Sequence, residues 1–218
     1  MKQLFTRVFS SLQKLLRGVE APGAMKCIVG LGNPGEEYRA TRHNAGIRVI
    51  ESLVQLSAAK LHRGNGDFFF AECADRGDRF LAIAPVTFMN ESGRAMKQAM
   101  LQFRLSPSDF IIVYDDFQLP LGTLRIREDG GDGGHNGLAS IINELQTEHI
   151  PRLRVGIAGT SRPTENKGEL MATYVLSPFE TEEAKIAEHM INHARDAILA
   201  WVHHGIRYSM NNFNKSFL

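Results

Sequence analysis

The sequence predicts a single α/β domain in which helices flank a central, twisted sheet that is mixed but mostly parallel. A length of 218 residues is typical of one domain, and a hydrophobic fraction of 43% is enough for a substantial core. Short apolar runs alternate along the chain with longer segments of helical periodicity, as in α/β proteins. Two of the strands follow one another without a helix between them, which predicts a mixed sheet.

The first half of the chain supplies a strand, a helix and a pair of strands. The apolar run at 26–31 ends in glycines and predicts the first strand. Apolar residues recur at helical spacing over 44–59, with Asn44 as a candidate N-cap. Two further strands, at 68–74 and 80–84, are separated only by a short turn-forming segment.

The second half continues the alternation. A helix is expected at 90–103, followed by strands at 110–114 and 123–127. A glycine-rich loop at 129–134 comes next, and its glycines permit backbone conformations closed to other residues. The remaining predicted segments are a helix at 135–145, a strand at 153–158, a long amphipathic helix at 181–203 and a tail at 211–218. We expect no linker before this tail.

Residues 1–24 form an N-terminal extension ahead of the domain expected at 25–218. Apolar residues recur there at helical spacing beside four basic residues and one acidic residue, a net charge of +3, before an Ala-Pro-Gly break. Three interpretations stay open: an organelle targeting segment, a stretch upstream of a true start at Met25, and a genuine helix packed on the domain.

Charge and hydropathy restrict the function classes. The net charge of +1 leaves −2 for residues 25–218, so a nucleic-acid contact requires a local basic cluster. No apolar run reaches the roughly 18–20 residues that span a bilayer, so we expect a soluble protein, cytoplasmic unless residues 1–24 direct it to an organelle. Cys27 and Cys73 lie in apolar runs without metal-ligand spacing, which predicts buried thiols in a reducing compartment.

Four polar segments interrupt the apolar pattern, each at the end of a strand or the start of a helix. They are GLGNPG at 30–35, YRATRHNAG at 38–46, TFMN at 87–90 and GHNG at 134–137. Asp115 closes the apolar strand at 110–114. Because ligand sites in α/β sheets collect at the carboxyl ends of strands, we expect these segments to share one crevice.

The residue types in this crevice favour one kind of hydrolysis. The sequence has no G-x-S-x-G elbow, its cysteines lie inside strands, and its glutamates show no glycosidase arrangement. A neutral His43 can take a proton from water, and Asp115 on its far nitrogen would fix the tautomer. Asn33, Asn90 and Asn136 can bind a peptide or an oxyanion without charge. We therefore expect direct attack of water on an ester carbonyl.

The segments at 38–46 and 133–138 resemble the two signature segments of bacterial-type peptidyl-tRNA hydrolases. The similarity includes 30–35, 87–90 and Asp115, and it runs over nearly all of residues 25–214. It implies hydrolysis of the ester between a peptide and tRNA, which recycles peptidyl-tRNA released from ribosomes. No metal ligand set is visible in the sequence, so we expect no metal ion and no cofactor. We expect a monomer.

The resemblance implies a role for each matching polar residue. His43 matches the catalytic base and Asp115 the aspartate that partners it. Asn33 and Asn90 match asparagines that bind the peptide and position the ester. Asn136 matches an asparagine that engages the substrate and helps to place the water.

The resemblance also implies the contacts that hold the substrate. Tyr38 and Met89 match positions in the pocket wall, near the tRNA end and the peptide. Arg127 and Arg154 match a basic pair that grips the tRNA 5′ phosphate, where relatives often have lysine at the first position. Arginine keeps the charge and adds bidentate geometry.

Four positions depart from the family pattern. Asp132 stands where some relatives have histidine, and Ala139 stands where a basic residue is common. Glu128 and Asp129 add negative charge beside the expected phosphate contact. These changes bear on tRNA affinity more than on catalysis.

Local structural roles compete with several of these assignments. Asn33 suits a tight turn, and Asn90 suits the cap of the helix that follows it. His135 stands beside glycines at the start of a helix and is expected to hold the loop. Arg152 and Arg154 alternate with apolar residues, so the pattern alone predicts ordinary exposed strand positions.

Two other functions stay open. One is a non-catalytic RNA-binding relative of the same fold, such as a recruited splicing factor, which would not hydrolyse the ester. The other is a nucleotide-dependent enzyme built around 30–35. Pro34 interrupts the dinucleotide fingerprint in that segment, which weighs against nucleotide binding.

Overall fold

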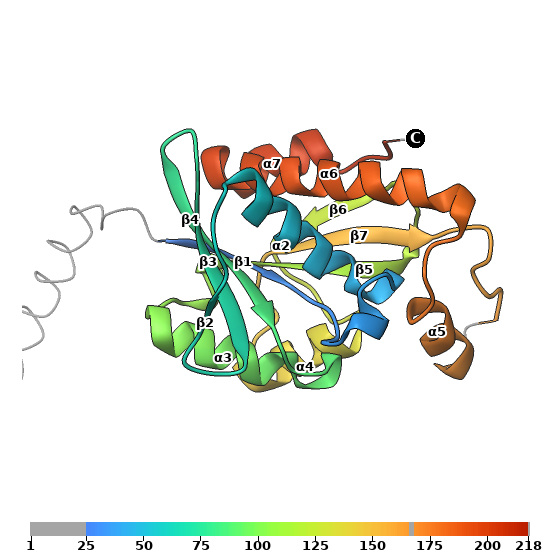
Figure 1. Ribbon diagram of the computed structural model, residues 1–218, viewed down its shortest axis with the longest axis horizontal. Helices are drawn as coiled ribbons and strands as arrows, with labels where there is room; N and C mark the ends of the chain where they lie inside the picture. The colour runs from blue at the N-terminus through green and yellow to red at the C-terminus, as the bar shows by residue number, and fades with distance from the viewer. Residues whose placement is uncertain (1–24, 166–167, 218) are drawn as a thin grey trace, which may run out of the picture.

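The computed structural model describes residues 25–165 and 168–217 (Figure 1). The expectations for residues 1–24 lie outside these ranges. Cys27 and Cys73 are both buried and free, as expected. Among the described helices, none combines the length and the apolar character that a membrane span requires.

One sheet forms the centre of the described chain. Its strands are ordered β2-β3-β4-β1-β5-β7-β6. β4, β1, β5 and β7 are parallel to one another, whereas β2, β3 and β6 join the sheet through antiparallel pairs. The bounds are β1 Lys26–Gly30, β2 His62–Arg63, β3 Phe68–Asp75, β4 Asp78–Pro85, β5 Phe110–Pro120, β6 Leu124–Arg127 and β7 Arg152–Ala158. The predicted mixed, mostly parallel sheet is confirmed.

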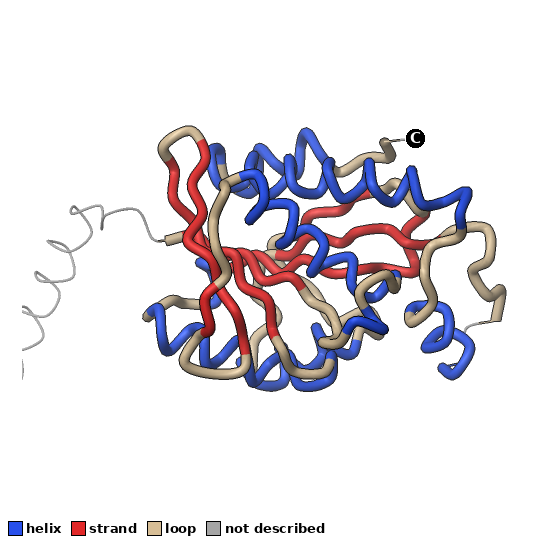
Figure 2. Tube along the Cα trace, in the orientation of Figure 1, coloured by secondary structure: helices blue, strands red, loops and turns tan. Residues whose placement is uncertain are grey.

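Helices cover both faces of this sheet (Figure 2). α2, α6 and α7 lie on one face, and α3 and α4 lie on the other (Figure 1). The α-helices are α2 Ala45–Leu56, α3 Ser92–Phe103, α4 Asn136–Leu145, α5 Gly168–Val175, α6 Thr181–His204 and α7 Ile206–Phe213. Short 3-10 helices are η1 Glu36–Tyr38, η2 Arg42–Asn44, η3 Met89–Glu91 and η4 Pro107–Asp109.

The two faces of the sheet belong to two separate hydrophobic clusters. Successive side chains of a strand point to opposite faces, so each central strand contributes to both clusters. Ile28, Ile111 and Val113 pack with α2 and α6, whereas Val29 and Ile112 pack with α3 and α4. This alternation also fixes which way the polar residues at the strand ends point.

The structure adds elements that the sequence pattern does not predict. β2 and α5 are short, and neither is long enough to produce a clear periodic signal. β5 runs on to Pro120, because Asp115 and Asp116 continue to pair with β7 beyond the expected end at residue 114. The tail at 211–218 begins inside α7, and Asn214 Oδ1 then accepts a hydrogen bond from Ile126 N at 2.5 Å.

The start of α2 approaches the ends of β1 and β5 very closely. Ile47 N donates to Leu31 O, and Leu31 N donates to Val113 O. A Cβ atom on Gly46 would collide with the carbonyl oxygen of Val113 and with the backbone of Leu31. A Cβ on Gly30 would likewise meet the carbonyl of Gly46. Glycine at these positions lets the first turn of α2 approach the middle of β5.

We therefore expect Gly46→Ala to destabilise the protein, although the same exchange within a helix ordinarily stabilises it. Overpacking against backbone atoms should cost about 1–3 kcal/mol, measured from the urea midpoint of unfolding. Gly168→Ala at the start of α5 is the matched control, because an added Cβ there meets nothing within 4 Å. An equal or higher midpoint for Gly46→Ala would contradict the close approach.

Candidate active site

The centre of the candidate site is a buried contact between an imidazole and a carboxylate. His43 lies in η2, just before α2, and Asp115 lies in the middle of β5. His43 Nδ1 is 2.8 Å from Asp115 Oδ1, and the two residues are only 8% and 1% exposed. Donation from Nδ1–H to the carboxylate leaves Nε2 of His43 as a proton acceptor. The structure therefore brings the predicted base and its partner together.

A second imidazole reaches the same carboxylate oxygen. His135 Nε2 is 3.2 Å from Asp115 Oδ1, and the rings of His43 and His135 lie 5.0 Å apart. His135 Nδ1 accepts a hydrogen bond from Leu138 N and so caps α4. Nδ1 therefore carries no proton, and the hydrogen on Nε2 points to Asp115. His135 begins the helix as expected, but it also belongs to the site.

The two imidazoles determine the charge state of Asp115. Burial raises the pKa of Asp115, but the charge of His43 and the hydrogen bonds from both imidazoles hold that pKa well below its usual range. Burial lowers the pKa of His43, yet the charge of Asp115 and the hydrogen bond to it leave the pKa above its ordinary value. Asp115 Oδ2 is buried without a hydrogen-bond partner among the described residues. The carboxylate is thus ionised and held through one oxygen.

These three side chains could also be considered as metal ligands. One ligand atom from each of His43, Asp115 and His135 lies within 4.8 Å of the others. A metal on His135 Nε2 would move the ring proton to Nδ1, where Leu138 N–H already donates. The hydrogen bonds therefore suit a proton-transfer site better than a metal site.

A cavity of about 280 Å³ opens beside the two histidines. We call it the base pocket; among its lining residues are His43, Asp115, His135, Asn136, Met171 and Val175. Asn136 is exposed at the first position of α4, where the helix N-terminus faces the pocket. Met171 and Val175 belong to α5, so this short helix supplies the apolar wall.

Asn33 is linked to the segment that carries His43 by two hydrogen bonds with Asn44, the residue that follows His43. Asn33 N donates to Asn44 Oδ1 at 2.8 Å, and Asn44 Nδ2 donates to Asn33 O at 2.9 Å. Asn33 Oδ1 accepts from Met89 N at 2.8 Å. Asn44 occupies the N-cap position of α2, as expected, but its side chain makes no cap bond there. Its amide is instead used to hold the loop after β1.

The other residues predicted to hold the substrate are not among the residues that line the base pocket. Asn90 is exposed in η3, and its predicted role as a helix cap is wrong because Glu91 precedes α3. Met89 is 5% exposed and packs in the core beneath α3 and α4. Tyr38 is half-buried at the end of η1.

A second cavity, of about 410 Å³, contains both predicted phosphate-binding arginines. We call it the arginine pocket; among its lining residues are Tyr114, Asp116, Arg127, Asp129, Arg152 and Arg154. Gly133 borders this pocket and the base pocket, so the glycine-rich loop separates the two. Arg127 is exposed at the end of β6, and Arg154 projects from β7.

Arg152 is buried, although its strand pattern predicts an exposed position. It is 1% exposed, and its guanidinium donates to the carbonyl oxygens of Gly130, Gly131, Glu148 and Ile150. These bonds brace the glycine-rich loop from below. All four acceptors lie outside the strands, so the alternation of apolar and polar residues along β7 gives no signal for these bonds.

Asp132 helps to close the same loop. Its Oδ1 accepts from Gly134 N at 2.7 Å, and its carbonyl accepts from His135 N at 3.0 Å. The carboxylate that replaces a histidine of some relatives is therefore used within the loop. Asp129 is exposed and lies 3.5 Å from His149.

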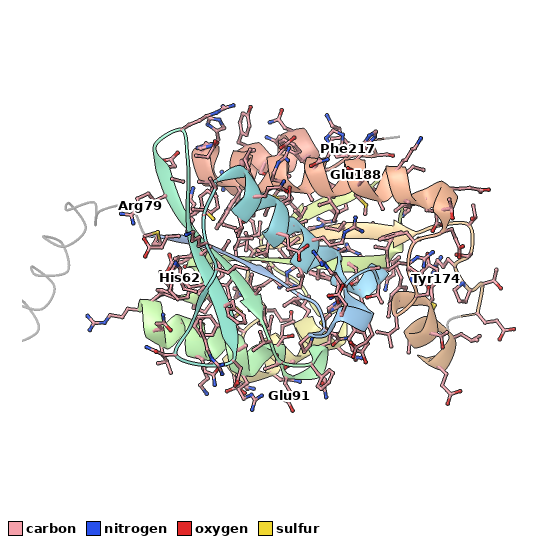
Figure 3. All side chains as sticks on the ribbon, in the orientation of Figure 1. His62, Arg79, Glu91, Tyr174, Glu188 and Phe217 are labelled. Carbon is pink, nitrogen blue, oxygen red and sulfur yellow. The ribbon has the colours of Figure 1, made fainter. Side chains whose placement is uncertain are left out.

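Arg42 is a further residue of the site that sequence reasoning does not single out. It is fully buried, donates to Ser177 Oγ and to Glu183 Oε2 at 2.7 Å each, and stacks on the ring of Tyr174. Tyr174 lies in α5 beside the loop that leads to α6 (Figure 3). Arg42 thus fixes η2, and with it His43, against the α5 side of the base pocket. Its only signal is its position next to His43.

Comparison with known proteins agrees with this architecture. A family model described as peptidyl-tRNA hydrolase matches residues 27–217. The peptidyl-tRNA hydrolase of Chlorobaculum parvum is 38% identical over 192 residues, covering 88% of this chain and 99% of the relative. The peptidyl-tRNA hydrolase of Sulfurihydrogenibium sp. is 42% identical over 195 residues, which cover 89% of this chain and 100% of the relative. The crystal structure of peptidyl-tRNA hydrolase from Acinetobacter baumannii is 28% identical, covers 90% of this chain and 98% of that one, and superposes with a TM-score of 0.81.

The contact with Asp115 should be visible in the titration of His43. We expect the His43 imidazole in the wild-type protein to titrate above its ordinary pKa of about 6.5, because its protonated form pairs with the carboxylate. Asp115→Asn should lower this pKa. Histidine NMR resonances followed against pH measure both values.

Glu72→Gln is the control for this titration, because it also removes one carboxylate but lies on the exposed β3–β4 hairpin. It should leave the His43 curve unchanged. A wild-type His43 that titrates below its ordinary pKa, or that does not respond to Asp115→Asn, would contradict the assignment.

Proposed function

The chain belongs to the peptidyl-tRNA hydrolase family, and we propose on that premise that it hydrolyses the ester bond between a peptide and tRNA. Such an enzyme recycles peptidyl-tRNA released from ribosomes. The observation that carries the mechanism is the 2.8 Å contact of His43 Nδ1 with the buried Asp115, at the edge of the base pocket. This contact directs the free Nε2 of His43 toward proton transfer with the substrate site.

The proposed reaction needs one base and one water molecule. His43 Nε2 takes a proton from water as the water oxygen attacks the ester carbonyl carbon. The tetrahedral intermediate then breaks the bond to the ribose oxygen, and the imidazolium returns its proton to that leaving oxygen. The products are a peptide with a free carboxylate and a tRNA with a free ribose hydroxyl. Asp115 stabilises the imidazolium that forms in between.

Amide groups and a helix end assist the carbonyl. Asn136 lines the base pocket at the N-terminus of α4, where the helix dipole favours a developing negative charge on the carbonyl oxygen. Asn136 can also orient the attacking water. Asn33 Oδ1 accepts a hydrogen bond from Met89 N, so the Nδ2 group of Asn33 is assigned to the substrate. Asn90, exposed in η3, is assigned to the peptide.

The charge of the base pocket favours substrates without a free amino group. Asp115 is the only carboxylate among its lining residues in the described chain, and both imidazoles donate to it. An α-ammonium group would lose its water here without gaining an acidic partner. Peptidyl-tRNA and N-acetylaminoacyl-tRNA should therefore react faster than ordinary aminoacyl-tRNA.

The arginine pocket is proposed to bind the 5′ phosphate of the tRNA. Arg127 and Arg154 both line it, and their guanidinium groups suit a phosphate. Tyr38 and Met89 are assigned to the wall near the acceptor end and the peptide. A monomeric enzyme without a metal ion, acting in the cytoplasm where ribosomes release peptidyl-tRNA, remains our expectation.

The glycine segment at 30–35 does not favour a nucleotide-dependent enzyme. The space beside Gly30 is filled by the carbonyl of Gly46, and a Cβ on Gly32 would lie 2.5 Å from the side chain of Ile47. These glycines serve the packing of α2 on the sheet. A non-catalytic RNA-binding role is also not favoured, because the complete pair of His43 and Asp115 is assembled.

Replacing the base should abolish most of the activity. His43→Ala should reduce kcat/KM for N-acetylaminoacyl-tRNA by about 10²–10⁴-fold or more, since a general base contributes at least that much. Binding of tRNA should stay close to wild type. His189→Ala, an exposed histidine of α6, should retain full activity. Hydrolysis by His43→Ala at the wild-type rate would exclude the mechanism.

The arginines should matter only for substrates that carry the tRNA. Arg127→Gln and Arg154→Gln should each raise KM for the full-length substrate and leave a short ester mimic unaffected. Each lost phosphate contact should also reduce the dependence of log K on log salt by about 0.7–0.9.

The control for the arginine variants is Arg79→Gln on the β3–β4 hairpin, which lies at the opposite end of the molecule from Tyr174 and α5 (Figure 3). It should change neither KM nor the salt dependence. An identical loss on both substrates for Arg127→Gln and Arg154→Gln would show that these arginines do not touch the nucleic acid.

A further inference from the structure

Asp116 lines the arginine pocket and has no role in the mechanism above. It follows Asp115 on β5, and successive strand residues point to opposite faces. Asp115 accordingly faces the base pocket, and Asp116 faces the arginine pocket with Tyr114. Two neighbouring carboxylates of one strand thus serve two different cavities.

Both oxygens of Asp116 are engaged. Oδ2 accepts from Arg154 Nε at 2.5 Å, and Oδ1 accepts from Gln118 N at 2.8 Å. The side chains of Asp116 and Arg154 are 10% and 24% exposed. A carboxylate that is held at both oxygens and largely shielded from water has little freedom to turn. Asp116 therefore fixes the direction in which Arg154 leaves β7.

Because Arg154 bonds to Asp116 through Nε, the two terminal NH₂ groups of its guanidinium stay available for a ligand. No hydrogen bond to its two terminal NH₂ groups is formed within the described chain, and the residue lines the arginine pocket. These groups are the donors that form parallel bonds to phosphate oxygens. We infer that Asp116 is a positioning residue that presents Arg154 to the 5′ phosphate of the tRNA. This inference rests on the proposed function of the arginine pocket.

The second bond of Asp116 links this arrangement to the glycine-rich loop. Gln118, whose backbone N–H is held by Asp116, donates from Nε2 to Gly133 O at 3.1 Å. Gly133 borders both pockets. Asp116 therefore steadies two sides of the arginine pocket at once, the Arg154 side chain and the loop.

A carboxylate beside the phosphate site has two opposing effects. Its negative charge repels the phosphate, which would make removal of Asp116 tighten binding. Its hydrogen bond orients Arg154, which would make removal weaken binding. Hydrogen bonds to charged groups contribute more than partly screened charges several ångströms apart. We therefore expect the orienting hydrogen bond to outweigh the repulsion, so that removal of Asp116 weakens binding of the phosphate.

Asp116→Asn distinguishes the two effects by the direction in which KM changes: loss of orientation raises KM, whereas loss of repulsion lowers it. The amide has the same size but only one acceptor oxygen, so it cannot serve both Gln118 N and Arg154 Nε. For full-length N-acetylaminoacyl-tRNA with its 5′ phosphate, KM should rise about tenfold, because a charge-assisted hydrogen bond is lost. The same tRNA after removal of that phosphate, and a short ester mimic, should show unchanged KM. The kcat should stay at the wild-type level on all three substrates.

Two controls accompany this variant. Glu72→Gln removes a carboxylate that pairs with Arg79 at 2.6 Å on the exposed hairpin and should change nothing. In an Arg154→Gln background, Asp116→Asn should no longer raise KM, because the residue that it positions is gone and only the repulsion by its charge remains. Asp116→Ala, which frees Arg154 without an amide nitrogen near it, repeats the test if the asparagine variant loses stability.

The outcomes distinguish the inference from the function on which it rests. If Arg154→Gln raises KM equally with and without the 5′ phosphate, the phosphate contact itself is wrong, and the inference falls with it. If Arg154→Gln discriminates the two tRNAs but Asp116→Asn leaves KM unchanged or lowers it, the inference alone is overturned. An equal loss of kcat on all three substrates would assign Asp116 to the base pocket and also overturn it.

Discussion

The hydrogen bond between His43 and Asp115 is the contact on which the rest of the site depends. It joins η2, just before α2, to the middle of β5, and β1, which precedes η2 in the chain, pairs directly with β5 in the sheet. Gly46 allows the backbone approach that this contact needs, and Arg42 holds the opposite side of η2. Burying an ionised carboxylate costs several kcal/mol, so a fold that places Asp115 there requires the two imidazoles that stabilise its charge.

β5 divides the chemistry between two cavities by simple strand alternation. Asp115 lines the base pocket, where we propose that a proton moves, and Asp116 lines a pocket whose arginines suit an anion. The glycine-rich loop separates them, and Arg152 braces it from within the fold. The base pocket lies beside the carboxyl-terminal half of β5, whereas the arginine pocket extends to Arg152 at the start of β7. The site is therefore a direct consequence of strand order and register.

Sequence reasoning predicts the sheet, the long helices and the pairing of His43 with Asp115, because strand ends and helix starts carry local signals. It does not predict contacts that depend on how distant segments pack. The carboxylate shared with His135, the burial of Arg152 and the use of Asn44 within the loop after β1 all depend on such packing. The local pattern around each of these residues is compatible with an ordinary cap or an exposed strand position. Tertiary structure overrides propensity at these points, and they cluster around the site.

The pH dependence of hydrolysis tests the central claim most directly. The kcat/KM for N-acetylaminoacyl-tRNA should rise with pH as His43 loses its proton, and the acid limb should reflect the raised pKa of this imidazole in the free enzyme. In Asp115→Asn the limb should move to lower pH, and the plateau should fall by about 10²–10⁴-fold. A limb that keeps its position and a plateau that keeps its height in this variant would contradict the account.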